Sequence, residues 1–106
     1  MTKVKPTIKL KLDKNYESFN QFYDDNRDVI YKSIIDIFNQ FLTTDKIELT
    51  LSVNAKIDNL DWGTDFTFTK NQKITLSRDI LPYFEMVEDY DTCIKIRDLI
   101  KKLNGG

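Results

Sequence analysis

Residues 47–57 read IELTLSVNAKI, and this stretch decides the fold class. Every odd-numbered position holds an apolar residue and every even-numbered position holds a polar one. A period of two residues is typical of a β-strand, because successive side chains point to opposite faces of the sheet. The segment is therefore predicted to be a strand with one buried and one solvated face.

Two further segments alternate in the same way. Residues 62–69 follow the first strand after a short polar segment, 58–61, which predicts a loop and an antiparallel hairpin. Gly63, near the start of this strand, suggests a bulge or a turn. Residues 7–13 form a third strand, whose apolar side chains share one face and whose lysines share the other.

Between the strands predicted at residues 7–13 and 47–57, from Tyr16 to about Leu42, the period changes. Apolar residues recur at spacings of three, four and seven, which is typical of an amphipathic helix. The polar residues 24–27 interrupt this stripe. Either one helix runs through them or two helices meet there, and we favour one helix with a kink.

The last third of the chain is predicted to form a helical hairpin. Residues 70–73 suggest a turn, and 74–76 a very short strand or an extended segment. Pro82 fits a helix only in its first turn, so a helix is expected to begin around Asp79, capped by Ser77 or Asp79. Residues 88–91 end it.

Asp89 or Asp91 then caps a final helix, which is expected to end at Asn104-Gly105-Gly106. The predicted order is strand, helix, strand, strand, helix, helix, in one domain spanning residues 1–106. We therefore predict an α+β fold. Its three-stranded, mostly antiparallel sheet is packed on one face by the long helix, and the hairpin follows.

Composition excludes several classes of function. Lys and Arg number 16 against 17 Asp and Glu, a net charge of -1, which is not the basic balance of a general nucleic-acid binder. The chain has no His, which removes His-based triads and His metal sites. Its one Cys excludes an intrachain disulfide and a cysteine zinc cluster. No phosphate-binding glycine loop is present either, so we predict no catalytic residues, no cofactor and no metal.

Two groups of acids are the remaining candidates for a metal site. Asp24, Asp25 and Asp28 form one group, and Asp58, Asp61 and Asp65 form the other. Neither has the central Gly and the closing Glu of a calcium-binding loop. We interpret both groups as solvated caps and turns.

The C-terminal segment, about residues 78–103, resembles the UVR motif of nucleotide-excision-repair proteins. The motif positions are filled by Tyr90, Asp91, Cys93, Ile96, Arg97, Asp98, Ile100 and Leu103. Cys93 and Ile94 depart from the family, which prefers a pair of alanines there. The resemblance implies a helical hairpin that mediates protein–protein contact.

These observations favour a small protein that works by binding, as an adaptor or inhibitor of a larger intracellular protein or protein–nucleic acid complex. Aromatic residues near acids are typical anchors of protein interfaces. The candidate partner-binding residues are Trp62, Asp65, Glu85, Glu88, Asp89, Tyr90, Asp91 and Arg97.

The alternative hypothesis is weak binding to nucleic acid. Lys5, Lys9, Lys11 and Lys14 lie on or beside the strand predicted at residues 7–13. They form a local basic stripe that can contact phosphates. Lysines also protect edge strands against mispairing, and we favour this second interpretation.

No signal peptide and no apolar run long enough to cross a membrane is visible, so we expect a cytoplasmic protein. The composition is rich in Lys, Asn, Ile and Asp, as AT-rich coding DNA produces. Together with the small size, it also allows a phage-encoded protein that acts on a host machine such as a defence nuclease.

Overall fold

A β-α-β unit at the start of the chain fixes the topology of the sheet. The computed structural model describes residues 8–105. In it, strand β1 (Ile8–Tyr16) leads through helix α1 (Phe19–Gln40) to strand β2 (Glu48–Ile57), which pairs with β1 in parallel. Strand β3 (Leu60–Thr69) pairs with β2 in antiparallel, giving the strand order β1-β2-β3.

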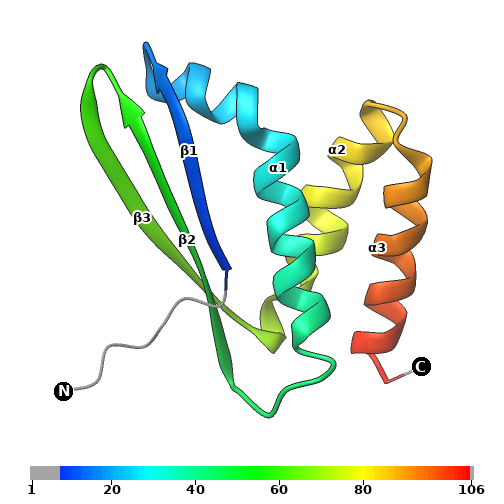
Figure 1. Ribbon diagram of the computed structural model, residues 1–106. Coiled ribbons are helices and arrows are strands. Elements are labelled where there is room, and N and C mark those ends of the chain that lie inside the picture. Colours follow the sequence, from blue (N-terminus) through cyan, green and yellow to red (C-terminus); the bar gives the residue numbers. More distant parts are fainter. Residues whose placement is uncertain (1–7, 106) are drawn as a thin grey trace, which may run out of the picture.

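The α+β class and the three-stranded sheet are therefore confirmed, but the sheet is mixed and the prediction of a mostly antiparallel sheet is wrong. The reason is α1, which carries the chain back along the sheet so that β2 starts at the same end as β1 (Figure 1). The element order also differs from the prediction, because two short helical turns precede the C-terminal hairpin.

The β2–β3 hairpin is regular along its whole length. Its turn holds only Asp58 and Asn59, whose φ angles are 52° and 63°, as the favoured two-residue hairpin turns require. The predicted loop was thus two residues too long. Gly63 forms no bulge: it pairs with Asn54, and a Cβ atom there would lie 2.6 Å from the Asn54 Oδ1. A larger residue at this position would therefore require the Asn54 side chain to move.

Strand β1 is irregular where β2 is not. It is longer than the predicted 7–13 segment, and its register shifts between Lys11 and Asn15, where β1 has two more residues than β2. Beyond this bulge, the Asn15 side chain fixes the tip of the β2–β3 hairpin. Its Nδ2 donates to Asn59 Oδ1 at 3.1 Å, and its Oδ1 accepts from the Asn59 backbone N–H at 3.0 Å.

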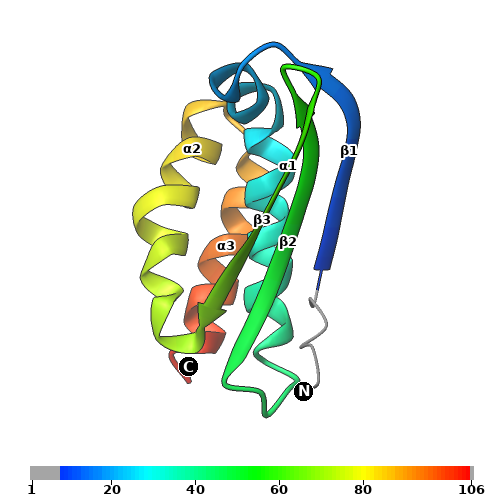
Figure 2. The same cartoon turned by 90° about the vertical axis from the view of Figure 1, so that its left-hand side faces the viewer.

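The core lies between one face of the sheet and the helices, and the other face is open (Figure 2). Leu49, Leu51 and Val53 of the central strand are buried, as the alternation predicts, whereas Ile47, predicted for the same buried face, lies before β2 and is 82% exposed. From α1 the core receives chiefly Phe22, Ile37 and Phe38. None of the helices that the structure describes has the length and apolar character needed to cross a membrane.

Helix α1 passes through the polar interruption as one helix, capped by the Ser18 side chain, which accepts from the Gln21 N–H. Figure 1 shows its first turns inclined to the remainder. Asn26 is buried in this stretch and has partners. Its Nδ2 donates to the Phe22 carbonyl at 2.8 Å, and its Oδ1 accepts from the Tyr16 hydroxyl at 3.3 Å. Burying this amide is tolerable because both of its ends are bonded.

The segment before α2 was predicted wrongly. Residues 70–86 are helical throughout, so neither an extended segment at 74–76 nor a cap at Ser77 or Asp79 is present. A π-helical turn over Leu76–Ile80 leads into α2 (Leu81–Met86), with Pro82 in the first turn of α2. Proline lacks the N–H that a continuous α-helix would use, and a π turn accommodates this defect.

The final helix follows the prediction closely. Helix α3 (Tyr90–Leu103) is capped by Asp89, whose side chain accepts from the Thr92 N–H. Glu88, with φ of 60°, makes the sharp turn between α2 and α3. The helix ends before Gly105, whose φ of 79° favours glycine. Gly106 lies outside the described residues.

Candidate interaction surface

Helices α2 and α3 pack against each other and turn sharply at residues 87–89. Phe84, Cys93 and Ile96 are fully buried in this hairpin. Across it, the Arg97 Nη2 lies 3.4 Å from the Glu85 Oε2. This ion pair shows that Glu85 and Arg97 face the same side of the hairpin.

Large apolar residues are also exposed on this hairpin. Tyr90 and Ile94 lie one helical turn apart on α3, in line with Arg97, and are 61% and 55% exposed. Met86 and Val87, at the end of α2, are 69% and 46% exposed. Exposed apolar side chains in one short segment are typical of interaction sites, whereas isolated ones are normal on any surface.

Exposed acids alternate in the chain with these apolar residues. We define the hairpin surface as eight exposed residues at the end of α2, in the α2–α3 turn and in the first two turns of α3. They are Glu85, Met86, Val87, Glu88, Tyr90, Asp91, Ile94 and Arg97. An apolar centre with a charged rim is the usual anatomy of a protein interface.

Five of the predicted partner-binding residues therefore lie together, namely Glu85, Glu88, Tyr90, Asp91 and Arg97. Three members of the surface, Met86, Val87 and Ile94, were missing from the prediction. The signal for Ile94 was its position beside the buried stripe of α3. Met86 and Val87 gave no comparable signal. The sequence predicted that the helix ends at residues 88–91, whereas α2 ends at Met86.

Asp89 shapes the hairpin surface from within. Its carboxylate accepts from the Thr92 hydroxyl at 2.7 Å and from the Thr92 N–H at 3.3 Å. These hydrogen bonds, chiefly the hydroxyl one, hold the pKa of Asp89 below its ordinary value of 3.8. Lys32 of α1 also lies 3.9 Å from Asp89, so the start of α3 is tied to α1.

A cluster of tyrosines holds α2 on α1. The Tyr83 ring meets the Tyr31 ring edge to face at 5.4 Å, and the Tyr31 hydroxyl lies 3.2 Å from that of Tyr23. Burial, together with this hydrogen bond, raises the pKa of Tyr31 to about 12. The Arg27 guanidinium lies 4.9 Å from the Tyr23 ring centroid and 5.8 Å from that of Tyr83. Its Nε is buried and has no hydrogen-bond partner among residues 8–105.

Trp62 and Asp65 lie away from the hairpin surface, on β3. The Trp62 ring packs on Phe19 at 5.4 Å and on Phe22 at 5.2 Å, so it is part of the sheet–α1 packing. Asp65 is exposed on the open face of the sheet, opposite Ser52. The structure thus divides the predicted partner-binding residues between two places.

The lysines of the alternative hypothesis are not an isolated basic patch. Lys9 and Lys11 of β1 are exposed on the open face of the sheet, which also carries acids such as Asp65 of β3 and Glu48 of β2. Lys14 pairs with Asp25 at 3.8 Å, and its Nζ lies 5.5 Å from the Tyr16 ring centroid. Lys5 lies outside the described residues.

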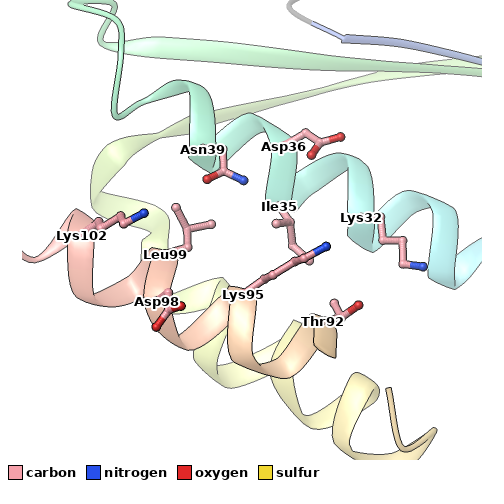
Figure 3. Close-up of a pocket in the computed structure, with 9 residues that line it drawn as sticks. All are labelled: Lys32, Ile35, Asp36, Asn39, Thr92, Lys95, Asp98, Leu99 and Lys102. Atoms are coloured by element: carbon pink, nitrogen blue, oxygen red, sulfur yellow. The ribbon is translucent and has the colours of Figure 1, made fainter. Parts of the chain in front are cut away.

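A groove of about 470 Å³ separates α1 from α3. Figure 3 shows Ile35 and Leu99 between the two helices, with Lys95 and Lys102 reaching from α3 toward α1. Asp36 and Asp98 also line it, together with Lys32, Asn39 and Thr92. Because lysines and aspartates alternate around it, the groove has no field of one sign that would select an anion or a cation.

Within residues 8–105, no three or more acidic or cysteine side chains are grouped so that they could hold a metal ion. In the predicted acidic groups, Asp24 pairs with Arg27, Asp25 with Lys14 and Asp28 with Lys32. Cys93 is buried in the hairpin and is not disulfide-bonded.

Comparison of the chain with protein-family models, with curated proteins and with solved structures finds no match. Any statement about function therefore depends on the geometry described above.

Proposed function

We propose that the protein is a non-enzymatic interaction module that binds a larger intracellular protein through the hairpin surface, as an adaptor or an inhibitor. The exposure of Met86, Val87, Tyr90 and Ile94 within nine residues is the observation that carries this proposal. Exposed to water, these apolar side chains do not stabilise the free chain. Burying them against a partner contributes about 25 cal/mol per Å² of apolar area, from which the cost of association is subtracted.

Two further features support the proposal. Glu85, Glu88 and Asp91 form an acidic rim, which favours a partner whose own rim is basic. The segment is also the one that resembles the UVR motif, and in that family the hairpin mediates protein contact. Ile94, one of the two departures from the motif, points to solvent, so its bulk does not disturb the α2–α3 packing.

A double substitution tests the proposal directly. Tyr90→Ser with Ile94→Ser removes the exposed apolar side chains of α3 and leaves the buried stripe intact. The matched control is Ile47→Ser with Leu60→Ser, since these residues are 82% and 70% exposed and lie outside the hairpin surface. Each immobilised protein is incubated with a cell lysate, and the proteins that it retains are compared by mass spectrometry.

We expect the wild type and the control to retain the same partner and the hairpin variant to lose it. Equal recovery on all three proteins would contradict the proposal. A salt-sensitive gel shift that disappears with Lys9→Glu and Lys11→Glu would favour nucleic-acid binding instead.

A further inference from the structure

The two edges of the sheet differ in how they are protected. Strand β1 carries Lys9 and Lys11 on its open face and is broken by the bulge before Asn15. Both devices hinder another strand from pairing with that edge. Strand β3 is regular over ten residues and has no bulge, proline or lysine. Within the described part of the chain, nothing pairs with its outer side.

The backbone groups available at this edge follow from the hairpin register. Because Asp58 and Asn59 form a two-residue turn, Ile57 and Leu60 make a hydrogen-bonded pair, and such pairs alternate along the strands. The N–H and C=O groups of the even-numbered residues of β3 therefore point to β2. Those of Asp61, Gly63, Asp65 and Thr67 point outward.

The side chains of β3 define what could pair there. On the open face, Asp61 and Asp65 are exposed, and neither forms an ion pair within residues 8–105. On the helix face, Phe66 is 42% exposed although its neighbours in the sheet, such as Leu51, are buried. Figure 2 shows α2 lying beyond the β3 edge of the sheet, so an added strand would lie over the helix layer.

We propose that the β3 edge accepts an extended segment of a partner protein as a fourth strand, in which basic residues alternate with apolar ones. The basic side chains would face Asp61 and Asp65, and the apolar ones would cover Phe66. Main-chain hydrogen bonds supply affinity in this mode of recognition, and the alternate side chains supply specificity. Charge complementarity disfavours β3 of a second copy, since it would bring the same aspartates to this edge.

Trp62 makes the test direct, because it is the only tryptophan of the chain and lies on β3. Its fluorescence is followed while the protein is titrated with a capped hexapeptide that alternates Lys and Val. The comparison peptide alternates Glu and Val. We expect a saturable change with the lysine peptide and at least about tenfold weaker binding of the glutamate peptide.

Three variants sharpen the result. Asp61→Lys with Asp65→Lys should reverse the preference between the two peptides. Thr67→Pro removes an outward N–H and leaves the backbone hydrogen bonds to β2 in place, although it also removes the 3.1 Å hydroxyl contact between Thr67 and Thr50, and it should abolish binding of both peptides. The matched control is Asp36→Lys with Asp98→Lys, which makes the same change of net charge at the α1–α3 groove and should keep the preference for lysine. Circular dichroism establishes that each variant is folded.

Equal binding of both peptides, or reversal of the preference in the control, would overturn the proposal. Dimerisation without peptide, seen by sedimentation and prevented by Thr67→Pro, would also overturn it, because the occupant would then be a second copy. The Tyr90→Ser and Ile94→Ser protein should bind the lysine peptide like the wild type. The β3 site and the hairpin surface can thus fail independently.

Discussion

In β2, Leu49, Leu51 and Val53 are buried against the helices, whereas at the α2–α3 turn Met86 and Tyr90 point into solvent. Both segments are rich in large apolar residues. The strand buries them to hold the fold together, whereas the α2–α3 hairpin contributes some apolar side chains to the same core and leaves others exposed. The difference indicates that stability and binding are carried by separate sets of side chains, which single substitutions can distinguish.

The largest effect is expected in β2. Leu51→Ala should lower the free energy of unfolding by about 2–5 kcal/mol, because the removed atoms leave a cavity in a fully buried site. Urea unfolding followed by circular dichroism measures this loss. A change below about 1 kcal/mol would mean that the sheet core relaxes around the smaller side chain.

A smaller effect is expected at the start of the hairpin. Asp89→Asn keeps a side chain that caps α3 but removes the carboxylate charge that Thr92 stabilises. Because the pKa of Asp89 is lowered in the folded state, its charge stabilises the fold above pH 3.8, the ordinary value, and this contribution is lost as the pH falls through the lowered pKa. Unfolding curves at neutral and acidic pH should converge for the two proteins in acid. A constant difference at all pH values would contradict this.

The ion pair across the hairpin is expected to contribute less than a buried contact. Glu85 and Arg97 are each about half exposed, so a double-mutant cycle with Glu85→Gln and Arg97→Gln should give a coupling of about 0.2–1 kcal/mol. The coupling should decrease in high salt because screening weakens exposed charges. A salt-independent coupling would mean that the two side chains interact through packing.

The smallest effect on stability is expected for the exposed apolar side chains. Tyr90→Ser with Ile94→Ser should change the free energy of unfolding by less than about 0.5 kcal/mol for each residue, apart from small differences in helix propensity. The same urea experiment measures it. A loss as large as that of Leu51→Ala would show that these residues support the fold, and the comparison between β2 and the hairpin would fail.

The sequence predicts the β2–β3 hairpin well, because alternation over residues 47–57 leaves one choice of buried face. It predicts the parallel pairing of β1 poorly, since alternation records which face is buried and carries no information on strand direction. The helical run before Pro82 was missed because a π turn leaves no residue pattern of its own. Met86 and Val87 were missed for a related reason: exposure at the end of a helix depends on where the helix ends, and this lies within the usual uncertainty of boundaries.

The parallel pairing of β1 and β2 has a consequence for the order of folding. Ile8 pairs with Leu51, a partner 43 residues later in the chain, whereas β2 and β3 are joined by a turn of two. Local hairpins form within microseconds, but pairings that close long loops are slow. During synthesis, β1 therefore stays unpaired until β2 has emerged from the ribosome. The charges of Lys9 and Lys11 would hinder the unpaired strand from pairing with other chains.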